Sequence, residues 1–293
     1  MTALQPANRL RSVVELHVAV FLFGLAGLFG KLTDVAPTTI AFARTTVAAG
    51  ALIIILKWSR PRLAAFARQD LALLIVAGAF LAAHWVAFFH SIQISSVAIG
   101  LIGFAVFPVF VALVEPLAFD VQFRKIDILC AVGVATGLAV VAPSFNISDV
   151  ATRGLLWAVS SGLLFALLTL INRHVAQKNE FRSVAAIQYG VASAFLLPAV
   201  FATSSAIPAQ SDILLLLVLG LIFTALPHTL LIKALAGVKA AYASVVVALE
   251  PVYGIVFAAL ILREYPAMRT VVGAAIVIIA VAIASTADRG DQL

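Results

Sequence analysis

Long apolar runs separated by short polar segments repeat along the whole chain. A helix of about 20 apolar residues is long enough to cross the hydrocarbon core of a bilayer, which is about 30 Å thick. Ten such runs are present, and we predict a transmembrane helix for each. They cover residues 12–32, 38–57, 70–91, 95–117, 126–142, 154–173, 182–203, 211–233, 240–262 and 268–286. The pattern therefore predicts an all-α polytopic membrane protein with ten transmembrane helices.

The composition agrees with a membrane protein. The 293 residues are 63% hydrophobic and only 11% charged, and the mean hydropathy is +1.15. A soluble domain is about 25% charged and needs polar cover for its surface. The single cysteine, Cys130, lies in an apolar run, which excludes an internal disulfide framework. The segments between the runs are too short for a soluble domain, so any chemistry must take place within the membrane.

The basic residues predict the orientation. Ten spans place both termini on the same side of the membrane. If that side is the cytoplasm, 14 of the 18 Lys and Arg residues outside the spans lie inside and 4 lie outside. Cytoplasmic loops carry an excess of Lys and Arg, so we expect cytoplasmic N- and C-termini. The net charge of +6 then reflects membrane topology, and we expect no nucleic-acid partner.

The two halves of the chain resemble each other. When Pro108 is aligned with Pro251, an offset of 143, residues 90–119 lie over residues 233–262 without a gap. Each half holds five spans, and an odd number makes the second copy enter the membrane from the opposite side. Such inverted repeats are typical of secondary transporters. The predicted repeats are residues 12–142 and 154–286.

One segment of each half resembles a known family. ALEPVYGIVFAALILRE (248–264) and FPVFVALVEPLAF (107–119) resemble the fourth-helix pattern of the drug/metabolite transporter superfamily, in its ten-helix branch of two EamA-type domains. Arg263 stands where the family usually has glycine, and Glu264 remains as the acid at the helix end. The resemblance implies alternating access to a central cavity between the repeats, with the fifth and tenth helices peripheral. Within the superfamily, the chain is similar to bacterial amino-acid exporters.

Glu250 and Pro251 interrupt the ninth predicted span. A charge at that depth costs several kcal/mol unless it is paired, hydrated or protonated. Glu250 is therefore a candidate for binding a proton or a substrate ammonium group; the alternative is a structural carboxylate that satisfies backbone donors. Pro108 and Pro251 each remove a backbone hydrogen bond, and we expect each to bend its helix. The bends either shape a cavity or act as hinges for gating.

Arg44 is the only basic residue well inside a predicted span. Its guanidinium matches a substrate carboxylate; alternatively, it extends toward the interface or pairs with an acid. In the third span, His84 and Phe88 share one helical face, and Trp85 is a further candidate whose alternative is packing. We expect these side chains to contact substrate.

Three more aromatic residues complete the predicted binding site. Trp157 in the sixth span would stack on an aromatic or aliphatic substrate, and its alternative is a position at the membrane interface. Tyr242 and Tyr253 are eleven residues apart, so they share a face of the ninth span near Glu250.

These observations favour a secondary transporter that exports amino acids, aromatic ones favoured, or similar small metabolites. The alternatives are a proton-coupled exporter of cationic drugs or amines, an intramembrane enzyme and a membrane scaffold. The sequence contains no P-loop and no hydrolase motif in a suitable context, so we expect no enzymatic activity, no cofactor and no metal. The expected partners are a small-molecule substrate and the lipid bilayer. We expect a monomer in a bacterial inner membrane, since the loops are short and no cleaved leader is recognisable.

Overall fold

The computed structural model describes residues 6–59, 66–118, 125–142, 144, 146–176, 179–203, 208–235, 246–247 and 249–287. All regular secondary structure within these ranges is helical. Seven of the described helical segments are long and apolar enough to cross a membrane, which confirms a polytopic helical membrane protein. They are Leu10–Leu32, Pro37–Ser59, Arg68–Ile94, Val97–Leu117, Val150–Asn172, Arg182–Ala202 and Gln210–Leu231.

Two of the other predicted spans, 126–142 and 268–286, correspond to the helices Lys125–Val141 and Met268–Ala287. The third, 240–262, is helical from Glu250 to Leu262, and its residues 240–245 and 248 lie outside the described part of the chain. The first half of the chain contains α1 (Pro6–Ala26), α2 (Phe29–Leu32), α3 (Pro37–Ser59), α4 (Arg68–Ile94), α5 (Val97–Phe104), α6 (Phe107–Ala118) and α7 (Lys125–Val141). The second half contains α8 (Val150–Ala176), α9 (Phe181–Thr203), α10 (Gln210–Gly220), the π-helical η1 (Leu221–Ala225), α11 (Leu226–Leu235), α13 (Glu250–Phe257), the π-helical η2 (Ala258–Leu262) and α14 (Met268–Ala287).

The prolines predicted to bend their helices lie at helix beginnings instead. The helical run 95–117 is interrupted after α5, and Pro108 is the second residue of α6. Pro251 is likewise the second residue of α13. A proline in the first helical turn loses no intrahelical hydrogen bond, because the N–H groups of that turn have no helical partner. Both prolines therefore mark the start of a new helix at the predicted equivalent positions.

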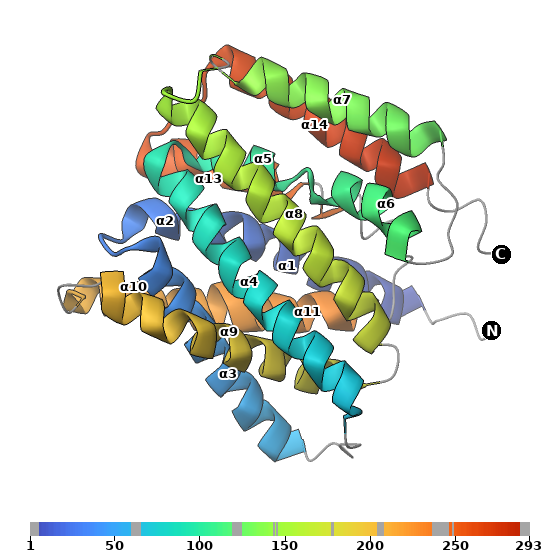
Figure 1. Ribbon diagram of the computed structural model, residues 1–293, viewed down its shortest axis with the longest axis vertical. Coiled ribbons are helices and arrows are strands. Elements are labelled where there is room, and N and C mark those ends of the chain that lie inside the picture. Colours follow the sequence, from blue (N-terminus) through green and yellow to red (C-terminus); the bar gives the residue numbers. More distant parts are fainter. Residues whose placement is uncertain are drawn as a thin grey trace.

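The helices pack in pairs that come from different halves of the chain. The helix α4 lies along α8, α3 packs against α9, and α7 pairs with α14 at one edge of the bundle (Figure 1). The helix α1 packs against α11 and α13. The first helix begins and the last helix ends on the same side of the bundle (Figure 1).

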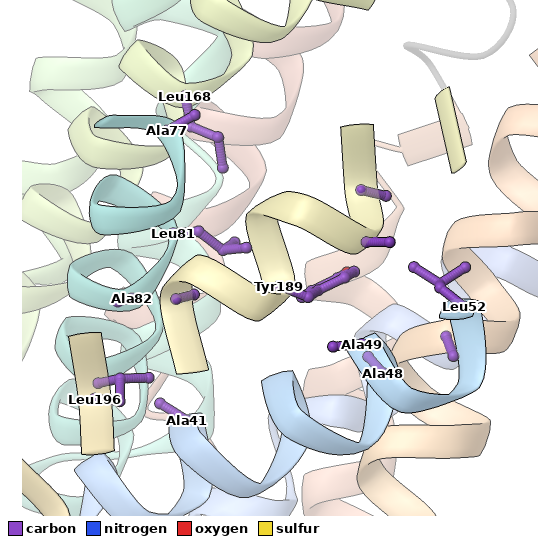
Figure 2. Close-up of a cluster of buried hydrophobic side chains, with 14 residues drawn as sticks. Ala41, Ala48, Ala49, Leu52, Ala77, Leu81, Ala82, Leu168, Tyr189 and Leu196 are labelled. Atoms are coloured by element: carbon purple, nitrogen blue, oxygen red, sulfur yellow. The ribbon is translucent and has the colours of Figure 1, made fainter. Parts of the chain in front are cut away.

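Small residues allow three of these helices to approach closely. A buried cluster joins α3, α4 and α9, and Figure 2 shows Ala48 and Ala49 of α3 on the side toward Tyr189 of α9. Ala41 and Ala48 of α3 are fully buried, as is Ala77 of α4. Between membrane helices, where lipid is as apolar as the protein core, close packing of small residues stabilises association. This cluster fixes α3 and α4 relative to each other, and both helices carry site residues.

Candidate functional site

Arg44 on α3 is the most deeply buried charged side chain of the described structure. Its exposed fraction is 0%, and its guanidinium carbon lies 3.2 Å from the centroid of the Trp85 ring. The ring of Phe89 follows at 5.4 Å. None of the three guanidinium nitrogens has a hydrogen-bond partner among the described residues. The cation–π contact is favourable, but it leaves the N–H donors of the guanidinium unsatisfied.

His84 on α4 connects this region to α8. Its Nδ1 lies 2.7 Å from the Ser161 hydroxyl oxygen and 3.1 Å from the Ser161 carbonyl oxygen. The other ring nitrogen, Nε2, is buried and has no partner in the part of the chain described. The sequence predicted His84 as a site residue but not its contact with Ser161. The hydrogen bond fixes the imidazole between α4 and α8.

Aromatic rings surround His84. The ring centroids of Trp85, Phe104 and Phe165 lie 4.5, 5.2 and 5.0 Å from the imidazole centroid, and that of Phe88 lies at 6.2 Å. These side chains come from α4, α5 and α8. Aromatic rings at these distances favour edge-to-face and offset contacts, which also suit a flat apolar ligand. We refer to His84, Trp85, Phe88, Phe104 and Phe165 as the aromatic cluster.

A narrow crevice of about 20 Å³, enough for about one water molecule, adjoins the aromatic cluster at Phe104. Among the described residues that line it, Glu250 is the only charged one, and Pro108 and Pro251 both contribute to its wall. The remaining lining residues are apolar: Phe104, Ala105, Phe107, Val247, Ile278 and Val281. The two predicted proline positions and the predicted carboxylate thus meet at one crevice.

Further polar groups lie close to Arg44. Glu250 and Tyr189 are near enough for electrostatic interaction with the guanidinium, although neither forms a hydrogen bond to it. Tyr189 on α9 contacts His228 on α11 edge to face, with ring centroids 5.9 Å apart. Tyr189 was not predicted, since a single tyrosine in an apolar run carries no pattern that distinguishes a site from packing.

The other predicted site residues make contacts elsewhere or lie outside the described residues. Trp157 is 45% exposed, and its ring contacts that of His90 at a centroid distance of 5.0 Å. Tyr253 packs edge to face on Phe21 of α1, with centroids 5.6 Å apart. Tyr242 lies outside the described residues. Contact of these three residues with substrate stays a prediction.

The acid after the ninth predicted span, Glu264, links the end of that span to the start of α5. Glu264 Oε1 accepts a hydrogen bond of 2.9 Å from the backbone N–H of Val97, which is the first residue of α5. Arg263 before it has φ 57°, the left-handed conformation that favours glycine. This explains why glycine is usual at that position of the pattern, and it shows that Arg263 retains the turn that directs Glu264 toward α5.

Membrane-spanning helices that bury a guanidinium and an imidazole among aromatic rings, with a half-buried carboxylate in the same bundle, are typical of membrane transport proteins, because ionisable groups at that depth mark substrate pathways. The profile of the EamA-like transporter family matches residues 12–142 and 152–286. The chain belongs to this family, and with it to the drug/metabolite transporter superfamily. The protein is therefore a membrane transporter.

Individual relatives agree with this assignment. The chain is similar to an "Uncharacterized transporter YxxF" of Bacillus subtilis (strain 168), with 23% identity over 252 residues, which cover 84% of this chain and 80% of the relative. It also resembles one solved crystal structure with a TM-score of 0.64 at 16% sequence identity, covering 96% of this chain and 97% of the other. The second likeness concerns the fold alone.

Proposed function

We propose that the protein is a secondary transporter that exports amino acids, with aromatic ones favoured, by alternating access. The observation that carries the proposal is the apolar crevice in which Glu250 is the only charged group among the described lining residues, next to the aromatic cluster on which Arg44 packs. Binding sites for small molecules combine apolar walls with a few polar groups that fix orientation. An aromatic amino acid has one cation, one anion and one flat apolar group, and this site has a counterpart for each.

Alternating access in this proposal uses ten spans arranged as two inverted five-helix repeats. Asp70 and Asp212 are 142 residues apart and lie in the first turns of α4 and α10. Asp70 accepts a hydrogen bond of 3.1 Å from Asn179 Nδ2, and Asp212 accepts one of 3.3 Å from the backbone N–H of Asp34. Each acid thus holds the connection that follows the first span of the opposite repeat. Two equivalent ties support a two-fold relation between the halves.

The two ties also suggest how access would alternate. In an inverted repeat, equivalent contacts lie on opposite faces of the membrane. Loosening the Asp70 contact would open one face, and loosening the Asp212 contact would open the other. Pro108 and Pro251, at the start of α6 and α13, provide the equivalent breaks about which these helices would tilt.

A reporter enzyme fused after Leu293 tests the proposed orientation. Both termini are proposed to be cytoplasmic, in a bacterial inner membrane, because the basic residues outside the spans are concentrated on that side. A reporter that is active only in the cytoplasm is expected to be active, and one that is active only outside is expected to be silent. The same pair fused after Asn146, in the proposed outer loop, is the control and should give the opposite result. Reversed signals would contradict both the orientation and the repeat assignment.

Flux in reconstituted vesicles tests the transport proposal. Purified protein in vesicles preloaded with unlabelled phenylalanine is expected to accumulate labelled phenylalanine at least tenfold faster than protein-free vesicles, since alternating access exchanges substrate across the bilayer. The measurement is repeated with and without a pH gradient. Chemical conversion of the substrate by protein in detergent would indicate an enzyme, and absence of flux for every compound would indicate a scaffold; either result contradicts the proposal.

The apolar wall around Glu250 also favours a second candidate, a proton-coupled exporter of cationic drugs or amines. In that case the carboxylate would bind either a proton or the cation, and Arg44 would have no role in recognition. Flux of an amine such as phenethylamine that depends on the pH gradient, without flux of phenylalanine, would support this second candidate. We propose that the functional unit is a single chain and that its partners are the substrate and the bilayer. We propose no enzymatic activity.

A further inference from the structure

We propose that Arg44, held on the face of Trp85, is the receptor for the carboxylate group of the transported molecule, and that the substrates are monocarboxylates with a flat or apolar body. This inference rests on the proposed transport function and adds the chemical group that the site recognises. It concerns any organic monocarboxylate, of which aromatic amino acids are one source and non-amino acids another.

The first step is the incomplete coordination of the guanidinium. The side chain of Arg44 is fully buried, and all three of its nitrogens are without a hydrogen-bond partner in the described structure. A buried charge without hydrogen bonds is unfavourable, and proteins pair such groups or use them for binding. The vacant donors of Arg44 are therefore suited to a ligand that supplies acceptors.

The second step is the geometry that Trp85 imposes. The guanidinium carbon lies 3.2 Å from the ring centroid, so nothing fits between the cation and the indole. A hydrogen-bond acceptor must therefore approach the edges of the guanidinium, where its N–H groups point. The edges carry parallel N–H groups that match the two oxygens of a carboxylate. Trp85 thus holds the guanidinium in place and leaves its recognition edges to the ligand.

The third step concerns the acidic and hydroxyl side chains near Arg44, which do not satisfy the N–H donors of its guanidinium. Glu250 and Tyr189 are within electrostatic range of Arg44, but neither completes a hydrogen bond to it. Glu250 instead lines the crevice beyond Phe104. It therefore balances part of the charge of Arg44 from a distance, and the N–H donors of Arg44 have no acceptor among the described residues.

The fourth step narrows the class of anion. The ring of Trp85 belongs to the aromatic cluster, and the rings of Trp85 and Phe89 are the apolar surfaces next to the cation. Such surfaces favour a ligand with an apolar body over a small hydrated anion. The carboxylate of Glu250 disfavours a dianion such as phosphate. A monocarboxylate satisfies both conditions, and an additional ammonium group would find Glu250.

The experiment compares three probes that share one aromatic body. Phenylalanine carries both charged groups, 3-phenylpropionate only the carboxylate and phenethylamine only the ammonium group. Their binding to purified protein in detergent is measured by calorimetry for the wild type, Arg44→Gln and Arg44→Lys. Lys31→Gln is the matched control, since Lys31 binds the Gln93 and Ser95 carbonyl oxygens at a helix end.

Arg44→Gln is expected to weaken the binding of phenylalanine and of 3-phenylpropionate at least tenfold. The binding of phenethylamine should weaken less than threefold. Arg44→Lys, which retains the charge and so protects folding, is expected to weaken the two carboxylates alone, because an ammonium group cannot form the paired hydrogen bonds. Lys31→Gln should change none of the three affinities by more than twofold. Equal losses for all three probes would overturn the inference, as they would indicate a structural role.

The outcomes also separate this inference from the proposed function. If 3-phenylpropionate binds through Arg44 while vesicles exchange no amino acid, the inference holds and amino-acid export is wrong. If phenylalanine is exchanged and bound equally well by Arg44→Lys and the wild type, amino-acid export holds and the inference is overturned. If the wild type binds neither carboxylate, the inference is overturned whatever the flux of amines.

Discussion

Replacement of Glu250 by glutamine is expected to reduce phenylalanine exchange in vesicles about 30-fold or more. Glutamine keeps the size of the side chain but cannot balance an ammonium group in the apolar crevice. Removing one partner of a buried charge pair costs about 2–5 kcal/mol, and about 2 kcal/mol corresponds to a factor of about 30 in rate. The measurement is the initial rate of labelled phenylalanine exchange by equal amounts of reconstituted protein.

Two comparisons separate recognition by Glu250 from a structural role. Exchange of 3-phenylpropionate by Glu250→Gln should fall less than threefold, because this compound lacks the ammonium group. Glu15→Gln makes the same chemical change on α1, where Glu15 pairs with Arg11 at 2.9 Å, and its exchange rates should stay within twofold of the wild type. A wild-type rate for phenylalanine in Glu250→Gln would leave Glu250 as a structural partner of the start of α13.

The helical class of the protein follows from the sequence because the membrane simplifies the problem. Lipid offers no hydrogen bonds to the backbone, so a long apolar run must be helical to cross the bilayer. The exact positions of the interruptions were not predicted, since hydropathy continues through them: Ala105 and Val106 between α5 and α6 are as apolar as their neighbours. The prolines indicated that the helix is broken nearby, but a proline tolerated in a first turn does not reveal on which side the break lies.

The candidate site was predictable where a polar group lies in an apolar run. Arg44, His84 and Glu250 are costly at that depth, so each required a specific environment, and the structure brings Arg44 and His84 to the same aromatic cluster. Helical spacing predicted which residues share a face, but not which face meets lipid. Trp157 and Tyr189 illustrate the difference, because the first is 45% exposed and the second 5% exposed, while both are single aromatic residues in apolar helices.

Gly24→Ala is expected to lower the free energy of unfolding by about 1–3 kcal/mol, the usual cost of overpacking. A Cβ atom at Gly24 would lie 2.8 Å from the carbonyl oxygen of Glu250 and 3.1 Å from the backbone nitrogen of Gly254. Backbone atoms cannot move aside as a flexible side chain can, so α1 and α13 must separate. Unfolding of the purified protein by SDS titration from mixed micelles measures the change.

The matched control for this crossing is Gly50→Ala on α3, where a Cβ atom would meet nothing within 4 Å. Since alanine favours a helix over glycine by about 1 kcal/mol, Gly50→Ala should unfold at an equal or higher SDS fraction than the wild type. Separation of α1 from α13 would also displace the backbone of Glu250, so Gly24→Ala should slow phenylalanine exchange in the molecules that remain folded, while Gly50→Ala should not. Equal stability of the two variants would contradict the close contact of α1 with α13, and with it the placement of Glu250 beside that crossing.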